Sequence, residues 1–410
     1  MSSVDNKTHV SDEMCKSINL SKKRINLILF SSIFCMFVLG FSMFKLLPMQ
    51  AAIQDYFNIE VSDYGYLNTA QNWFVILFTV PVGFLVRKIP CKWSMFLSFV
   101  LLLGGSVIQV FTSNYILFLI GRMLEGGGYG FMAIIAYSLT ANLVHQKRIG
   151  FWMSLLLTLG MLGQVIHTNV ASWMMITKGY SFQYVFTIII ILQVVCLITW
   201  LIFVPSKLKI SGIASSQKPT REQTLNVYKN SSNWLVAIAL IFFNIAIVSF
   251  SAYVIQYLII RGMKPEQAAV IYGYTSLIGI VSMLVFGWLS DKFKTKRKLA
   301  IISFFSGIVA LLLLIYVPIG AIMIYVVVFG TLPRSVAGMS SASATDIAEV
   351  PSDIPIVNSF RNTVSQLGGV IGGIILGYVI QYFGYEIAIY MLCVEMAIGG
   401  VCWIFAKRIP

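Results

Sequence analysis

Residues 183–204 read QYVFTIIIILQVVCLITWLIFV and contain no charged side chain. An α-helix needs about 20 apolar residues to cross the roughly 30 Å hydrocarbon core of a bilayer, so this run is long enough. The composition agrees, because 58% of the 410 residues are hydrophobic and 11% are charged. Soluble domains average about 45–50% and about 25%. The run therefore predicts a transmembrane helix.

Eleven further apolar runs flank this one. The twelve predicted spans cover residues 25–47, 66–86, 93–112, 115–143, 149–175, 183–204, 234–260, 267–289, 299–317, 321–345, 356–382 and 387–406. No small-residue cleavage site follows the first run, so we do not expect it to be removed as a signal. The sequence predicts an all-α integral membrane protein with twelve transmembrane helices.

The distribution of the net charge of +14 indicates how the chain is oriented in the membrane. Of the 29 Lys and Arg, 22 lie in the N-terminal tail, in the loops after the second, fourth, sixth and eighth spans, or at the C-terminus. Three lie in loops on the opposite side and four lie inside spans. Because basic loops stay on the cytoplasmic side, we expect both termini to be cytoplasmic in a cell membrane. We expect no nucleic-acid partner.

A hydrophilic stretch rich in Ser, Lys and Asn divides the spans into six and six. The predicted organisation is a tail at 1–24, a first bundle at 25–204, a linker at 205–233, a second bundle at 234–406 and a tail at 407–410. The linker composition is typical of a flexible connection. The chain is thus expected to form two six-helix halves.

The two halves carry matching landmarks. Gly83 and Gly287 end the second and eighth spans and are 204 positions apart. Gly160 and Gly368, in the fifth and eleventh spans, are 208 positions apart. Two landmarks at nearly one offset indicate an internal repeat, and such repeats place a substrate site between the halves, near the middle of the bilayer.

Two motifs resemble those of a known family. Residues 287–298 read GWLSDKFKTKRK, similar to the loop signature G-x-L-a-D-r-x-G-r-k of the major facilitator superfamily, with Lys294 in place of the second glycine. Residues 122–130 read RMLEGGGYG, similar to that family's fourth-helix signature with its intramembrane arginine. The loop after the second span is a poorer copy, with Arg87 at the aspartate position. The resemblance covers essentially the whole chain and implies a two-bundle transporter that works by alternating access.

Ionisable groups inside a membrane cost roughly 2.5–3.5 kcal/mol on insertion scales, so each needs an explanation. Arg122 and Glu125 are three residues apart and share a helix face. One interpretation is an internal ion pair that satisfies two buried charges. The other is that Glu125 takes up and releases a coupling proton, because the neighbouring cation favours its ionised form while desolvation favours its neutral form.

Three further cations lie within spans. Arg334 follows a proline between two glycines, a pattern that permits a kink exposing backbone to a cavity. A guanidinium there can bind a carboxylate through two hydrogen bonds. We predict that Arg334 binds an anionic substrate, aided by Arg122 and Arg361, and pairing with another side chain is the alternative. For Lys45 we expect the ammonium to extend to the membrane interface.

Two helix faces carry polar side chains suited to hydrogen bonding a substrate. The candidates on these faces are Tyr253, Gln256 and Tyr257 in the seventh span and Asn358 with Arg361 in the eleventh. Core filling explains the seventh-span face equally well. For His167, in the fifth span, we expect a structural role.

Charged loops predict a cytoplasmic gate. In the usual family pattern an aspartate after the second span meets the positive N-terminal end of the eleventh helix. Here that loop is basic and the segment before the eleventh span is acidic, which suggests the same lock with its charges exchanged. The predicted gating residues are Arg87, Lys88, Asp291, Arg148, Asp346, Glu349 and Asp353. Ordinary solvated loop charge is the alternative.

Four cations against two acids inside the spans favour an anionic substrate. We predict a monomeric secondary transporter of a small organic anion, coupled to protons or to substrate exchange. Proton-coupled efflux of amphipathic drugs is the alternative, weakened because the fifth span lacks the glycine-proline signature of many drug antiporters. A membrane sensor or enzyme would need a soluble domain or a reactive constellation, and we expect neither. The sequence has no phosphate-binding loop and no Cys/His cluster, so we expect no cofactor and no metal.

Overall fold

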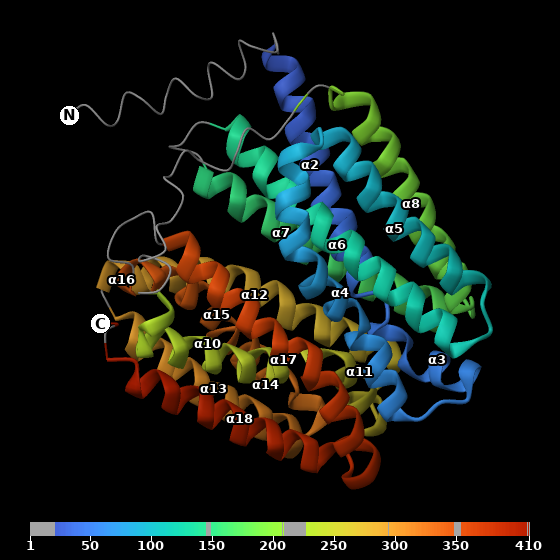
Figure 1. Cartoon of the computed structure of the whole chain (residues 1–410). Coiled ribbons are helices and arrows are strands. Elements are labelled where there is room, and N and C mark those ends of the chain that lie inside the picture. The colour runs from blue at the N-terminus through green and yellow to red at the C-terminus, as the bar shows by residue number, and fades with distance from the viewer. Residues whose placement is uncertain are drawn as a thin grey trace. The chain divides into compact units, whose positions relative to one another are not determined.

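The computed structural model describes residues 21–144, 149–206, 208, 227–293, 295–347, 354–407 and 409, and these form helices without any strand (Figure 1). Within these ranges, nine helical segments are long and apolar enough to cross a membrane. Helices α4 (Val61–Lys88), α6 (Tyr115–Leu143) and α12 (Pro265–Phe293) contain 28, 29 and 29 residues. At 1.5 Å per residue each is about 42 Å long. All twelve predicted spans therefore fall on helices.

Chain contacts divide the protein into two compact units. The first comprises Met1–Lys45, Ala70–Met175 and Gly179–Ser215. Besides α6 and most of α4, its helices are α2 (Lys22–Met43), α5 (Cys91–Phe111), α7 (Ile149–Ser172), most of the π-helical turn η3 (Trp173–Thr177) and α8 (Phe182–Phe203). Helix α2 packs against α6, α7 and α8, and α5 packs against α6 and α8. The core of this unit includes the buried side chains of Phe99, Met132 and Trp200.

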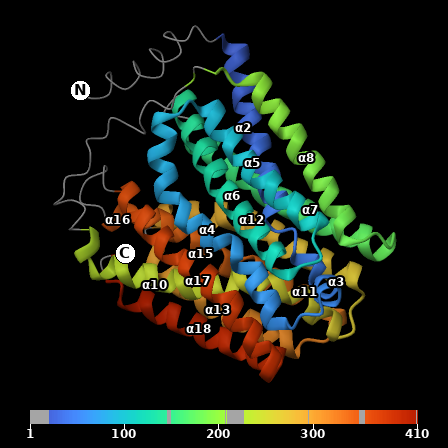
Figure 2. The ribbon, with the colours of Figure 1, turned by 45° about the vertical axis from the view of Figure 1, so that its right-hand side comes forward.

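The second unit comprises Leu46–Thr69, Ile176–Lys178 and Ser216–Pro410. Besides α12 and the first turns of α4, its elements are η1 (Leu47–Met49), α3 (Gln50–Phe57), α10 (Ser231–Asn244), η4 (Ile245–Ser249), α11 (Ser251–Ile260), α13 (Lys296–Tyr316), η5 (Ile319–Ala321), α14 (Met323–Gly330), α15 (Leu332–Ala342), α16 (Ala344–Ile347), α17 (Ile354–Phe383) and α18 (Tyr385–Phe405). Figure 2 gives a second view of the same elements.

The two units repeat one packing scheme. In the first, α2 packs against α7 and α8, and in the second α10 packs against α17 and α18. Two of the four landmark glycines, Gly160 and Gly368, lie at equivalent contacts. A side chain on Gly40 of α2 would clash with the carbonyl of Gly160 on α7, and one on Gly368 of α17 would clash with the carbonyl of Ile241 on α10. Small residues allow such close helix approach, which explains why the landmarks recur.

Candidate functional site

The first transmembrane segment is interrupted. Helix α2 ends at Met43, a turn follows, and the chain continues as the short 3-10 helix η1 with Pro48 in its first turn. A helix end leaves its last carbonyl groups without intrahelical partners, and proline has no backbone N–H to offer them. In an apolar interior these carbonyls must be satisfied by side chains.

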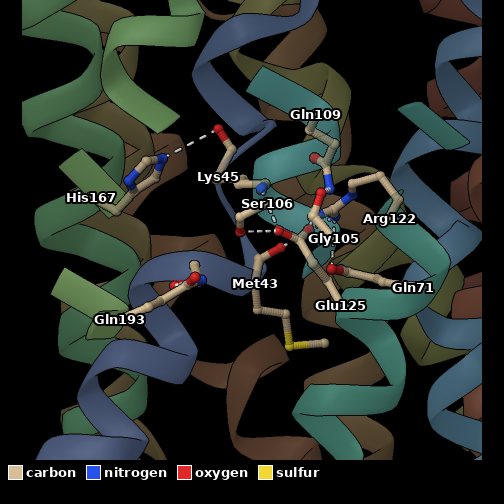
Figure 3. Close-up of polar contacts among 11 residues, drawn as sticks. Met43, Lys45, Gln71, Gly105, Ser106, Gln109, Arg122, Glu125, His167 and Gln193 are labelled. Atoms are coloured by element: carbon tan, nitrogen blue, oxygen red, sulfur yellow. Dashed lines mark hydrogen bonds and ion pairs between the residues drawn. The ribbon is translucent and has the colours of Figure 1, made fainter. Parts of the chain in front are cut away.

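Two side chains from other helices supply those partners. Arg122 Nη2 donates to the Met43 carbonyl at 3.4 Å, and His167 Nε2 lies 3.2 Å from the Lys45 carbonyl (Figure 3). Because a carbonyl oxygen only accepts hydrogen bonds, Nε2 of His167 carries the hydrogen. The structural role expected for His167 thus corresponds to one specific contact, the hydrogen bond to the Lys45 carbonyl.

Glu125 lies at the centre of this region. Its Oε1 accepts from Lys45 Nζ at 2.5 Å and from Ser106 Oγ at 2.5 Å, and its Oε2 lies 3.0 Å from Arg122 Nη1. The side chains of Lys45, Arg122 and Glu125 are all 0% exposed. Charge-assisted hydrogen bonds of this kind are about twice as strong as neutral ones. Both carboxylate oxygens therefore have a cation beside them.

Gln71 of α4 completes the group, since its Oε1 accepts from Arg122 Nη2 at 2.7 Å. We define the Glu125 cluster as Lys45, Gln71, Ser106, Arg122 and Glu125, which Figure 3 shows converging from α4, α5, α6 and the turn after α2. The contact between Arg122 and Glu125 is the one that their spacing predicted. The proton-carrying role of Glu125 remains a prediction.

The close approach of α5 and α6 depends on Gly105. A Cβ at this position would clash with the Gly121 carbonyl and lie 2.8 Å from Glu125 Cγ. Interiors packed to crystal-like density do not absorb such an atom without movement. Gly105 therefore lets Ser106, the next residue of α5, reach the carboxylate.

The prediction for Lys45 was wrong. The side chain does not extend to the membrane interface; it is fully buried, bonded to Glu125, and its Nζ lies 4.1 Å from the centre of the Phe186 ring. The two charged partners are 80 positions apart in the sequence, so no helical spacing connects them. The sequence feature that could have suggested this ion pair was the presence of a lysine and a glutamate inside predicted spans.

A second interruption lies in the tenth span. Helix α14 ends at Gly330 and α15 begins at Leu332, and Thr331 between them has φ −83° and ψ −96°, outside the helical region. Pro333 lies in the first turn of α15, where its missing N–H is tolerated. The kink expected from the proline and glycine pattern is therefore present.

Arg334 lies in the first turn of α15 and is half-buried. Its Nη2 donates to Thr275 Oγ1 at 3.4 Å, and the guanidinium carbon lies 5.8 Å from the centre of the Phe329 ring. Gly279 packs directly against its aliphatic stem. Among the described residues no carboxylate forms an ion pair with Arg334. Its Nε also lacks a hydrogen-bond partner there.

Arg361, the third predicted cation, has a different environment. It is 1% exposed, and its guanidinium bonds Asn233 Oδ1 at 2.8 Å, the Ser340 carbonyl at 2.6 Å and Ser343 Oγ at 2.9 Å. These contacts tie α17 to the start of α10 and the end of α15. The Nε and Nη1 atoms of Arg361 are thus engaged by protein partners, whereas its Nη2 has no hydrogen-bond partner among the described residues.

Two of the three candidate side chains on the polar face of the seventh span contact other parts of the protein. Tyr253 is buried and its hydroxyl donates to the Gly373 carbonyl at 2.8 Å, while the buried Tyr257 stacks on Tyr385 with ring centres 5.5 Å apart. These contacts fit the core-filling interpretation. Gln256 and Asn358 are half-buried and stay candidates for contact with a substrate.

Part of the predicted gate can be described. Asp346 is paired with Lys296 at 3.2 Å, within the second unit. Arg87 and Lys88 end α4 and Asp291 lies in the last turn of α12, but their side chains are not among those described. Arg148, Glu349 and Asp353 lie outside the described residues. The lock between oppositely charged loops stays a prediction.

Comparison with known proteins bears on these observations. The sequence profile of the Major Facilitator Superfamily matches residues 32–349. The fold is similar to the crystal structure of a bacterial homologue of the human lysosomal transporter Spinster, with a TM-score of 0.78 and 13% identity over 95% of this chain and 98% of that one. It is also similar to the nucleoside transporter NupG, with a TM-score of 0.74 and 10% identity over 94% and 99% of the two chains.

Curated proteins give no significant sequence match. The structural similarities are too distant in sequence to carry more than the fold, so they assign no substrate. The profile match, which covers more than half of the residues, assigns the family. Together with the helices long enough to span a bilayer and the repeated packing of the two units, it establishes that the chain is a multi-pass membrane transporter of the major facilitator superfamily.

Proposed function

We propose that this chain carries a small organic anion across the membrane by alternating access, and that Arg334 binds the anion. The observation that carries the proposal is the setting of Arg334. It is a half-buried guanidinium whose hydrogen bond in the described part of the chain goes to a neutral hydroxyl, at 3.4 Å. A cation held in an apolar interior without an acidic partner is costly, and an anionic ligand would remove that cost.

The broken helix supports the same proposal. The N-terminal end of a helix carries a partial positive charge, and broken helices in transporters point such ends at anionic substrate groups. Arg334 lies in the first turn of the 11-residue helix α15. The buried rings of Phe329 and Tyr325 stack with centres 5.2 Å apart, and the Phe329 ring lies beside the guanidinium, so the surroundings of Arg334 are apolar.

The test begins with a thermal-shift screen of the purified protein against monocarboxylates, dicarboxylates, inorganic phosphate and amphipathic cations. A ligand at about 100 times its Kd stabilises the native state by about 2.7 kcal/mol. We expect stabilisation by one class of anion, and uptake of the radiolabelled compound into proteoliposomes. Arg334→Gln should abolish both effects, whereas Arg24→Gln, at an exposed arginine of α2, should change neither.

Two outcomes contradict the proposal. Uptake by Arg334→Gln with unchanged apparent affinity would remove Arg334 from the binding site. Stabilisation by amphipathic cations but by no anion would favour the efflux alternative, in which the aromatic residues bind the substrate.

We further propose that protons drive this transport through the Glu125 cluster. Ionisable side chains buried in a membrane form proton relays in pumps and transporters, and this cluster holds three of them at 0% exposure. The expected result is uptake that accelerates when the proteoliposome exterior is acidified. An uptake rate that stays constant from about pH 5.5 to about pH 8, a range around the ordinary histidine pKa, argues for substrate exchange instead.

A further inference from the structure

The charges of the Glu125 cluster do not balance. Glu125 is bonded to two cations, Lys45 and Arg122. Between positions 21 and 215, the segments that form the first unit contain no acidic residue other than Glu125. With all three groups ionised, the cluster therefore carries one surplus positive charge in a region closed to solvent. Burial of an uncompensated charge is among the most costly events in a protein interior.

Each of the three groups changes that surplus differently. Protonation of Glu125 would raise it, because two cations would remain without a carboxylate. Arg122 cannot lose its proton in a protein. Loss of the proton from Lys45 removes the surplus and leaves one guanidinium balanced by one carboxylate, and lysine is the cation that deprotonates when buried.

The geometry permits this change. An amine at Lys45 still donates a hydrogen bond to Glu125 Oε1, 2.5 Å away, so the contact survives. Of the neighbouring titratable groups, His167 on α7 donates from Nε2 to the Lys45 carbonyl, and its neutral form serves that contact. Tyr129 of α6 is buried and neutral as a phenol. From α5 and α8 come Ser106 and Phe186, which do not titrate.

We propose that Lys45, and not Glu125, is the group that takes up and releases the coupling proton. This inference rests on the proton coupling proposed above and names its site. In the release step an N–H bond of Nζ breaks, its electron pair stays on the nitrogen, and the proton passes to water. Lys45 lies in the turn between α2 and η1, and the proton leaves in the state of the transport cycle that admits water to this turn.

The sign of the coupling follows. Protonated Lys45 gives the cluster its surplus positive charge, and an anionic substrate in the low-dielectric interior offsets such a charge. Proton and anion then favour each other's binding, by the reciprocity of linked sites. The inference predicts symport, with one proton carried by Lys45 for each transport cycle.

The first test needs no substrate. Melting temperatures of the detergent-solubilised full chain are measured from about pH 6 to about pH 10, below the ordinary lysine pKa of about 10.4. An unfolded lysine is protonated over this range, so a native state that holds the amine binds one proton fewer, and its stability rises with pH. We expect this rise in the wild type and its loss in Lys45→Met and in Lys45→Arg. Lys296→Met, at a second buried lysine with an acidic partner, should retain it.

Infrared spectroscopy provides the second test, with Glu125→Gln as the reference that assigns any carboxyl band. Over the same pH range, a protonated Glu125 would give a carboxylic-acid band in the wild type that is missing in Glu125→Gln. We expect no such band. Such a band assigns the proton to Glu125, and a rise in melting temperature with pH that persists unchanged in Lys45→Arg comes from a group other than Lys45. Either result overturns the inference. The anion-uptake results with Arg334→Gln are unaffected by either outcome, so failure here is distinguishable from failure of the proposed function.

Discussion

Two breaks in the described spans each have an arginine beside them, and these two arginines are in opposite situations. At the break after α2, Arg122 is fully buried and bonds a carboxylate, an amide and a backbone carbonyl. At the break before α15, Arg334 is half-buried and bonds one hydroxyl among the described residues. The same residue type at a similar backbone feature thus has acidic and amide partners in one unit and a single hydroxyl partner among the described residues in the other.

An arginine inside a membrane span therefore does not by itself indicate a substrate site. What distinguishes the two is the presence of an acid within reach and the extent of burial. Both follow from how neighbouring helices pack, so substitutions in the two regions should have unequal effects.

The largest effect is expected from Glu125→Gln. The variant removes the carboxylate from between two buried cations, and breaking a buried ion pair costs about 3–5 kcal/mol. The free energy of unfolding in detergent measures the loss. The matched control is Glu395→Gln, which removes a buried carboxyl of α18 whose Oε2 has no hydrogen-bond partner among the described residues. Equal losses in the two variants would show that Glu125 is no more tightly integrated than Glu395.

A smaller effect separates the hydroxyl groups that contact each region. Ser106→Ala deletes a 2.5 Å hydrogen bond to a carboxylate, and bonds to charged groups contribute about 1.5–3 kcal/mol. Thr275→Val deletes a 3.4 Å contact to Arg334, and we expect it to cost about 1 kcal/mol, chiefly from the loss of its bond to the Tyr272 carbonyl. Chemical unfolding of both variants provides the comparison, and the reverse order would contradict it.

Two glycine substitutions should act on different properties. Gly105→Ala forces a Cβ against the backbone of α6 and against Glu125, and overpacking of this kind costs about 1–3 kcal/mol. Gly279→Ala instead meets the flexible stem of Arg334, which moves aside. We expect Gly105→Ala to lower the melting temperature and Gly279→Ala mainly to weaken anion binding in the thermal-shift assay. A stable Gly105→Ala variant with full uptake would contradict the close packing of α5 on α6.

The smallest effect is expected at the pair of Lys296 and Asp346, whose side chains are 9% and 21% exposed. Partly exposed ion pairs contribute about 0–1 kcal/mol and are screened by salt. Asp346→Asn should therefore lower stability slightly at low ionic strength, and the difference should vanish near 1 M salt, where the Debye length is about 3 Å. A loss that persists at high salt would instead indicate a contact that solvent does not reach.

Local features of the site were accessible from the sequence. The pairing of Arg122 with Glu125 follows from a three-residue spacing on one helix, and the kink near Arg334 follows from Pro333 and its flanking glycines. In contrast, Lys45 meets Glu125 across 80 positions, and Arg361 meets Asn233 across 128. Contacts at such separations leave no periodic pattern in the chain, so they were assigned wrongly or not at all.

The amino-acid sequence predicted the membrane-spanning helices, an organisation in two six-helix halves and the family. These predictions depend on the length of apolar runs and on motifs a few residues long. Whether a segment can span the bilayer is decided by that segment's own residues. Only the tertiary structure decided which buried charges compensate one another, because the cost of a buried charge depends on the groups that packing brings within a few ångströms of it. That is why Lys45, Arg122, Arg334 and Arg361, alike as cations within spans, have different surroundings in the folded protein.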